Sequence, residues 1–162
     1  MFARLLGVAV ALLLLAACTH APPPPGPVGG PVGPVGPAGG AYAPGSQQDL
    51  AATAGDRVFF AYDRSDISPE AQQILQRQAE WLRRYPQVSV TIEGHCDERG
   101  TREYNLALGE RRAQAVKNVL VALGIPASRV STISYGKERP IVVGSNEEAW
   151  AQNRVGVTVV NQ

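Results

Sequence analysis

This chain has no large excess of charge of either sign, and it contains few histidines and cysteines. Its 162 residues include 15 basic and 14 acidic residues, and the formal net charge is +1. This balance gives no support to nucleic acid or to a broad anionic surface as a partner. The two histidines and two cysteines form no cluster with the spacing of metal ligands. The composition therefore points to a protein whose recognition, if any, is local.

Long hydrophobic runs are also rare, and the main one lies at the start. Leu5 to Ala17 is apolar throughout and follows Arg4, which is too short to span a bilayer and is typical of a signal-peptide core. It ends in Leu-Ala-Ala before Cys18, which resembles the bacterial lipoprotein processing site. The resemblance implies cleavage before Cys18 and lipidation of its thiol. The alternative is an ordinary secretory signal with a chance cysteine.

These features predict where in the cell the protein is located. We expect 1–17 to be a lipoprotein signal peptide and Cys18 to hold the mature chain in a bilayer through several acyl chains. Thr19 stands where an aspartate would resemble an inner-membrane retention signal, so we expect the outer membrane. Removal of Arg4 with the signal leaves 14 basic and 14 acidic residues. Cys96 is then the one remaining thiol, and an intramolecular disulfide is excluded.

A tether and one domain follow the anchor. From 21 to about 45 the chain is almost all Pro, Gly, Ala and Val, a composition that cannot bury enough apolar area to offset the entropy of ordering it. We therefore predict that 18–54 is a disordered spacer. Residues 55–162 are long enough for one compact domain.

The domain shows a regular alternation of strand and helix patterns. The spacing predicts strands at 58–62, 88–94, 130–135 and 155–160, long helices at 69–84 and 101–123, and a short helix at 147–153. The order β-α-β-α-β-(α)-β predicts an α+β fold. We expect a two-layer sandwich of one mixed sheet with the two long helices on one face.

One charge lies where none is expected. At 100° per residue, Arg112 is the only charged residue on the apolar face of the 101–123 helix. A buried guanidinium is costly unless an anion meets it. That anion is either a neighbouring carboxylate, such as Asp97 in a structural ion pair, or the carboxylate of a ligand.

The residues around this arginine carry a family resemblance. Gly-His-x-Asp-x-x-Gly at 94–100, followed by the Asn105, Leu108 and Arg112 pattern of the helix, resembles the OmpA-like peptidoglycan-binding domain. Similar blocks lie at 60–63, 134–140 and 153–154, so the resemblance covers nearly all of 55–162. The Asn-Arg-Arg that some members show reads Asn-Arg-Val at 153–155, so a role that needs the second arginine is absent.

The resemblance implies a function and a site. It implies non-covalent binding to the diaminopimelate of the peptidoglycan stem, and therefore anchoring of the outer membrane to the wall. The residues it places in the groove are Asp63, Asp97, Asn105, Leu108 and Arg112. With the lipid signal and the tether, it also implies docking to the periplasmic propeller protein TolB. No cofactor and no metal are implied.

The chemistry of the ligand suits these residues. The free end of diaminopimelate carries a carboxylate and an ammonium on one carbon, so a receptor needs a cation and an anion close together. Arg112 can grip the carboxylate with two hydrogen bonds, and Asp97 can accept from the ammonium. Asn105 could add a bond, and Leu108 could contact the aliphatic stem.

Two other classes of function stay open at this point. A wall hydrolase could use Glu93, Asp97 or Glu98 with His95, but no nucleophile elbow and no metal set are recognisable. A metal could sit where His95 and Cys96 lie beside two acidic residues, but the other histidine is in the tether. The sequence therefore favours a binding module that is not an enzyme.

Overall fold

A computed structural model of the chain describes residues 42–161. The predicted signal peptide at 1–17, the lipidation residue Cys18 and the tether up to residue 41 lie outside the described residues. Among the helices within residues 42–161, none combines the length and the apolar character needed to cross a bilayer.

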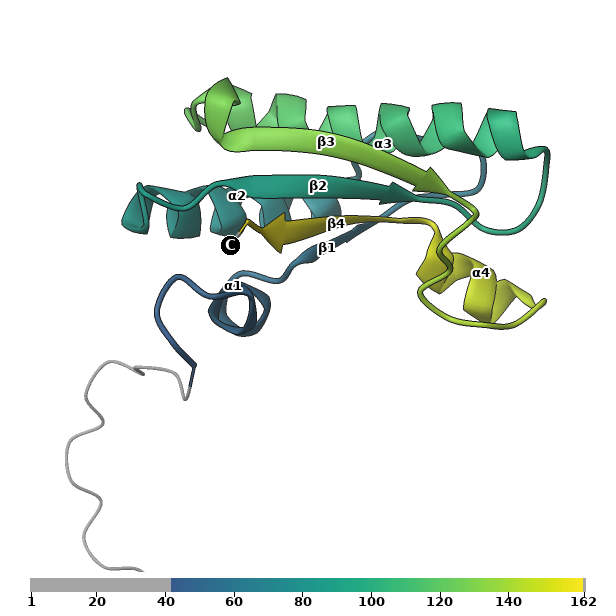
Figure 1. The fold of residues 1–162 in the computed structure, drawn as a ribbon, viewed down its shortest axis with the longest axis horizontal. Helices are drawn as coiled ribbons and strands as arrows, with labels where there is room; N and C mark the ends of the chain where they lie inside the picture. The colour runs from purple at the N-terminus through teal and green to yellow at the C-terminus, as the bar shows by residue number, and fades with distance from the viewer. Residues whose placement is uncertain (1–41, 162) are drawn as a thin grey trace, which may run out of the picture. The chain divides into compact units, whose positions relative to one another are not determined.

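Four strands form one mixed sheet in the spatial order β1-β4-β2-β3 (Figure 1). The strands are β1 (Arg57–Phe59), β2 (Val90–His95), β3 (Val130–Gly136) and β4 (Val155–Val160). β2 and β3 run parallel, whereas β4 runs antiparallel to both β1 and β2. The predicted strands are therefore all present, with the first one shorter than expected.

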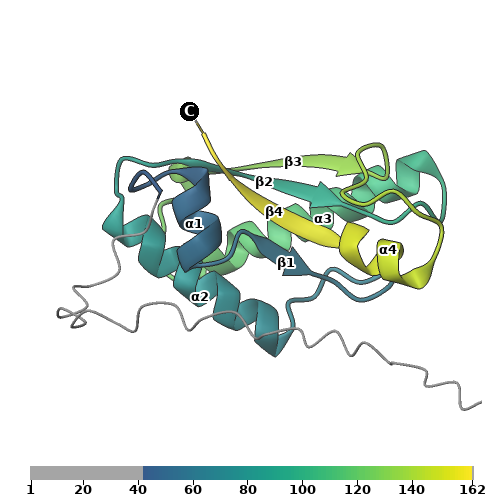
Figure 2. The same ribbon diagram turned by 90° about the horizontal axis from the view of Figure 1, so that it is seen from below.

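Two long helices, α2 (Pro69–Arg84) and α3 (Arg102–Ala122), cover one face of this sheet (Figures 1 and 2). The side chains of Ser68 and Thr101 cap them, each accepting from the backbone N–H three residues later. A 3-10 turn (Ala127–Arg129) precedes β3, and α4 (Glu147–Asn153) precedes β4. The α+β fold and the helices on one face are confirmed.

A short helix in the predicted tether is the main difference from the sequence analysis. α1 (Gln47–Thr53) begins after the cap Ser46 and packs beside α2. Leu50 is fully buried in the core, and Asp49 accepts from Gly45 N and from Trp81 Nε1. The prediction of a disordered spacer up to residue 54 is wrong for this segment, because burial of Leu50 and these bonds offset its ordering entropy.

A close contact between α3 and β2 positions the functional end of the molecule. A Cβ added to Gly94 of β2 would lie 1.9 Å from the carbonyl oxygen of Gly109 in α3, so only glycine allows this approach. The contact brings the first turns of α3 against the loop that leaves β2. Away from this end, the buried face of α3 joins the apolar core through Ala113, Val116 and Leu120.

Candidate ligand-binding site

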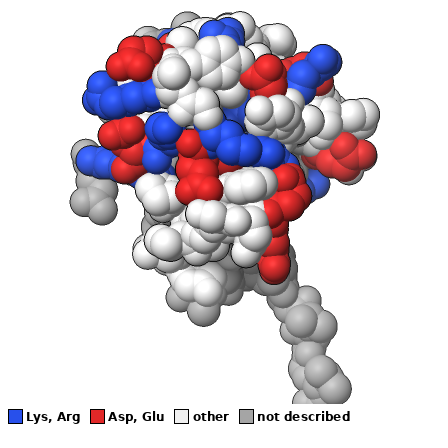
Figure 3. Space-filling view, turned by 90° about the vertical axis from the view of Figure 1, so that its right-hand side faces the viewer, with Lys and Arg blue, Asp and Glu red and all other residues white. Residues whose placement is uncertain are grey.

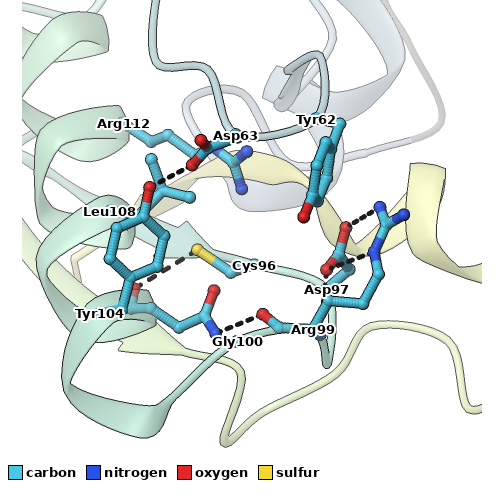
Figure 4. A pocket seen from close by; sticks show the side chains of 10 residues that line it. Tyr62, Asp63, Cys96, Asp97, Arg99, Gly100, Tyr104, Leu108 and Arg112 are labelled. Atoms are coloured by element: carbon cyan, nitrogen blue, oxygen red, sulfur yellow. Dashed lines mark hydrogen bonds and ion pairs between the residues drawn. The ribbon is translucent and has the colours of Figure 1, made fainter.

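A hollow of about 230 Å³ opens at the end of the sheet where β2 meets the start of α3. Its walls come from the β1–α2 loop, the β2–α3 loop and the first turns of α3 (Figure 4). All five residues placed in a groove by the sequence line it: Asp63, Asp97, Asn105, Leu108 and Arg112. Figure 3 shows that basic and acidic side chains interleave over this end of the molecule.

Arg112 is the buried base of the hollow, with 1% of its surface exposed. Its guanidinium donates to three backbone carbonyls: Nε to Arg64 (2.9 Å), Nη1 to His95 (2.8 Å) and Nη2 to Ala61 (3.2 Å). The Phe60 ring lies 5.2 Å from its Cζ. Burial lowers the pKa of Arg112, but arginine stays protonated in proteins. Arg112 therefore joins the β1–α2 loop to the end of β2 while keeping its charge.

The expected burial of Arg112 is confirmed, but the direct ion pair with Asp97 is not found. No carboxylate of residues 42–161 lies within 4.0 Å of the Arg112 guanidinium. A guanidinium has five N–H donors, and the three carbonyls account for three of them. The two terminal nitrogens each keep one further N–H, and the residue lines the hollow. A planar carboxylate is the group that such a pair of donors fits best.

Asp97 is held by two other arginines. Arg99 donates from its backbone N and Nε to Oδ1 (3.1 and 3.2 Å) and from Nη2 to Oδ2 (2.6 Å). Arg154 donates from Nη1 to Oδ2 (3.4 Å). Burial acts to raise the pKa of Asp97, but the bonds from Arg99 outweigh it and hold that pKa below its ordinary value. Asp97 is therefore an ionised carboxylate at neutral pH.

The loop that carries Asp63 forms the opposite wall. Asp63 adopts a left-handed conformation (φ 55°), which aspartate tolerates better than most residues. Its carboxylate accepts from the hydroxyl of Tyr104, and this bond raises the pKa of Tyr104. The carbonyls of the same loop accept from Arg112 and Arg154. The position of Asp63 is thus fixed from both sides.

Asn105 has different partners from those expected, whereas Leu108 lines the hollow as expected. The amide nitrogen of Asn105 donates to the carbonyls of Arg99 and Thr101 (2.7 and 3.0 Å), so both of its N–H groups hold the β2–α3 loop. Asn105 is 2% exposed and Leu108 5%. Both line the hollow, but the amide of Asn105 supports the loop in this state.

Neither Cys96 nor His95 shows the features of a reactive group. Cys96 is buried with its thiol on the Asn105 carbonyl (3.4 Å), and burial raises its pKa to about 11, so thiolate is scarce at neutral pH. His95 Nδ1 bonds the Arg139 carbonyl (2.9 Å), and Nε2 lies 3.6 Å from a Glu93 carboxylate oxygen. Within residues 42–161, no three His, Cys, Asp or Glu side chains are grouped as metal ligands.

Comparisons with known proteins identify the family of this chain. The OmpA family model matches residues 59–154. A peptidoglycan-associated lipoprotein from Brucella melitensis is 58% identical over 122 residues, which cover 75% of this chain and 73% of the relative. The chain belongs to the OmpA family and, within it, to the peptidoglycan-associated lipoproteins.

Two further relatives extend this membership. The peptidoglycan-associated lipoprotein of Mesorhizobium japonicum is 49% identical over 152 residues, covering 94% of this chain and 88% of the relative. A crystal structure of the peptidoglycan-associated lipoprotein from Burkholderia pseudomallei superposes with a TM-score of 0.64 at 42% identity. The superposition covers 65% of this chain and 90% of the Burkholderia chain. The predicted OmpA-like fold is thereby confirmed.

Four residues at this hollow were not predicted from the sequence as site residues. Tyr62, Arg99 and Tyr104 line the hollow, and Arg154 reaches Asp97 from the far side. The Asp97-x-Arg99 spacing before Gly100 was a usable signal, since an aspartate often accepts from the backbone two residues on. Arg154 lies in the 153–154 block of the resemblance, but its contacts with Phe60 and Asp97 join segments distant in sequence, so its place beside Asp97 had no local signal.

Proposed function

We propose that the domain binds peptidoglycan without covalent chemistry, by holding the zwitterionic end of diaminopimelate in the hollow. Arg112 meets the side-chain carboxylate of the ligand, and Asp97 meets its ammonium. Leu108 contacts the aliphatic stem, while Asn105 and Asp63 shape the walls. The names of the relatives, which are peptidoglycan-associated, support this ligand class.

One observation carries the proposal. Arg112 is fully buried, has no carboxylate partner among residues 42–161, and still lines an open hollow with two acidic residues. Desolvation of a cation costs free energy that three neutral carbonyls only partly offset. A ligand carboxylate would complete this offset through bidentate, charge-assisted bonds. The two acidic side chains nearby would favour a ligand that also carries a positive charge.

The proposed role of the whole protein is an anchor. Lipid on Cys18 would hold the chain in the outer membrane, and the domain would hold the wall in the periplasm. We include in the proposal a place in the Tol-Pal system with TolB as a partner, supporting envelope integrity and constriction at division. We propose no reaction at this site, since the buried thiol of Cys96 and the paired Asp97 are held in structural contacts.

Matched stem peptides test the ligand without altering the protein. Binding of the purified chain would be measured by calorimetry with three peptides: one ending in free diaminopimelate, one with its side-chain carboxylate amidated, and one with lysine. We expect measurable binding of the first and at least about tenfold weaker binding of the other two, because each lacks the charge that Arg112 would meet. Equal affinity for all three would contradict the proposal.

A second readout separates the anchor from an enzyme. The chain would be incubated with insoluble peptidoglycan, sedimented, and both fractions analysed. We expect the protein in the pellet and no soluble wall fragments in the supernatant. Release of fragments would instead indicate a hydrolase.

A further inference from the structure

Asp97 has no free acceptor position in this structure. An ionised carboxylate offers about four lone-pair positions. Three of them accept from Arg99 and the fourth accepts from Arg154. If the hollow takes a zwitterion, which is the proposed function on which this inference rests, its ammonium must replace a donor that is already bound.

Arg99 is the donor that can be exchanged. Its side chain is 29% exposed, whereas that of Arg154 is 9% exposed. Arg154 is also fixed by Phe60 O (3.1 Å) in the β1–α2 loop and by Glu147 (2.8 Å) at the start of α4, the helix that Arg154 follows. Displacing Arg154 would therefore break the contact with the β1–α2 loop, whereas displacing the Arg99 guanidinium would free the two acceptor positions of Asp97 that Nε and Nη2 occupy and leave the bond from its backbone N in place.

Two aromatic rings contact the Arg99 guanidinium, and a second carboxylate lies within its reach. Its Cζ lies 4.0 Å from the Tyr62 ring centroid and 4.2 Å from that of Trp150 (Figure 4 shows Tyr62). A guanidinium keeps a favourable contact with an aromatic face while it stays within about 6 Å of the ring centroid, so a short movement along the rings preserves it. Glu147 Oε2 lies 3.7 Å from Arg99 Nη1 and is a second carboxylate within reach.

We infer that Arg99 occupies the place of the ligand's ammonium in the free protein and is displaced by it. On binding, the ammonium donates to the Asp97 carboxylate in place of the Arg99 guanidinium, which moves along its two rings towards Glu147. Only charged contacts are exchanged, and no covalent bond changes. Arg112 keeps its three carbonyls throughout, so the carboxylate end of the site is preformed and the ammonium end is gated.

The exchange gives the site a specificity. A ligand whose amine is acylated has no positive charge and cannot replace a guanidinium on a buried carboxylate. Such a stem, as in a cross-linked peptide, would leave Arg99 in place. The site would thus select stems whose diaminopimelate amine is free.

Trp150 can report the exchange directly. The chain has two tryptophans; Trp81 is buried against Asp49, whereas Trp150 is partly exposed and stacks on Arg99. Fluorescence of the purified chain would be titrated with the free diaminopimelate stem peptide and with its amine-acetylated form. We expect a change of Trp150 emission with the first peptide and none with the second.

Two variants complete the test. Arg99→Ala should bind the free stem peptide about fivefold more tightly, because a partly exposed ion pair no longer competes and such pairs are worth up to about a factor of five. Its ligand-induced fluorescence change should disappear. Arg139→Ala is the matched control, since Arg139 stacks on Tyr135 at the same 4.0 Å but does not line the hollow. It should behave as the wild type.

The outcomes separate the two proposals. If the wild type does not bind the free stem peptide by calorimetry, the proposed function fails. If it binds but Trp150 emission does not change, or if Arg99→Ala binds more weakly, Arg99 is a fixed part of the site and the exchange is refuted. Should Arg99→Ala fail to fold, the wild-type titration with the two peptides decides the question alone.

Discussion

Two arginines, Arg112 and Arg129, bind backbone carbonyls in the same way in different parts of the molecule. Arg129 donates to the carbonyls of Leu82, Tyr85 and Val88 at 2.8–2.9 Å. These residues form the end of α2 and the turn that leads to β2, so Arg129 closes one helix end. Arg112 also binds three carbonyls, but two belong to the β1–α2 loop and one to the last residue of β2.

The difference between them shows how a buried cation is to be interpreted. A guanidinium on three carbonyls is a structural device, and by itself it indicates no ligand. Arg112 differs because it lines a hollow together with Asp63 and Asp97, and because its remaining N–H groups are on the two terminal nitrogens. Recognition is therefore inferred from the surroundings of the arginine and not from its burial.

The largest effect is expected when each of the two arginines is replaced by alanine, because only Arg112 is proposed to bind the ligand. Arg112→Ala should lower the free energy of unfolding by about 3 kcal/mol, because three buried carbonyls lose their donor, and should abolish binding of the free stem peptide. Arg129→Ala should lower it by about 2 kcal/mol, since that arginine is partly exposed, with affinity unchanged. Urea unfolding and calorimetry measure the two quantities.

Arg112→Lys serves as the control for folding. It keeps a charge at the position but has no planar fork, so it should recover part of the stability and little of the affinity. Normal binding by Arg112→Lys or Arg112→Ala would mean that Arg112 differs from Arg129 in burial alone.

A smaller effect is expected for two buried carboxylates, Asp97 in the hollow and Asp49 beside α1, which can be compared in the same way as the two arginines. Asp97→Asn should weaken binding of the free stem peptide about tenfold or more at pH 7, because the ammonium loses its anion. Asp49→Asn is the matched change beside α1, where Gly45 and Trp81 donate to the carboxylate. Asp49→Asn should lower the free energy of unfolding by about 1 kcal/mol and leave the affinity for the stem peptide unchanged. If calorimetry shows the same loss of affinity in both variants, Asp97 is not the partner of the ammonium.

The sequence predicted the position of these residues better than their partners. Helical spacing placed Arg112 on the buried face of α3, and the structure confirms it. It could not show that backbone carbonyls would satisfy the charge, because carbonyls exist at every residue and carry no sequence signal. Arg154 was missed for a similar reason, since its contacts with Phe60 and Asp97 span more than fifty residues.

The missed helix α1 has a different cause. It has seven residues and lies in a stretch rich in alanine, and helices this short gain most of their stability from tertiary contacts. The burial of Leu50 against the core supplies those contacts. Ser46 followed three residues later by Asp49 is a local helix-start signal, and the structure uses Ser46 as the cap, but a pattern of seven residues does not show that Leu50 is buried.

Acid should reduce stability through both carboxylates. Hydrogen bonds hold the pKa of Asp49 and that of Asp97 below the ordinary value of 3.8. In this case the unfolded chain binds more protons, so the stabilisation is present above about pH 4 and is lost as the pH falls through the lower folded pKa values. Urea unfolding from pH 7 to about pH 2.5 should show this decline. Asp49→Asn and Asp97→Asn should each make it shallower, and an unchanged slope in either would contradict the paired state of that carboxylate.

The smallest effect is expected at the rim of the hollow. Tyr104 is 44% exposed, and its hydroxyl donates to Asp63. Because an exposed hydrogen bond contributes about 0.5–1 kcal/mol, Tyr104→Phe should weaken binding of the free stem peptide only about twofold to fivefold. The matched control is Tyr42→Phe, another exposed tyrosine on the segment before α1, which should leave affinity unchanged. A loss as large as that of Asp97→Asn would place Tyr104 in direct contact with the ligand and would extend the recognition surface beyond the two charged residues.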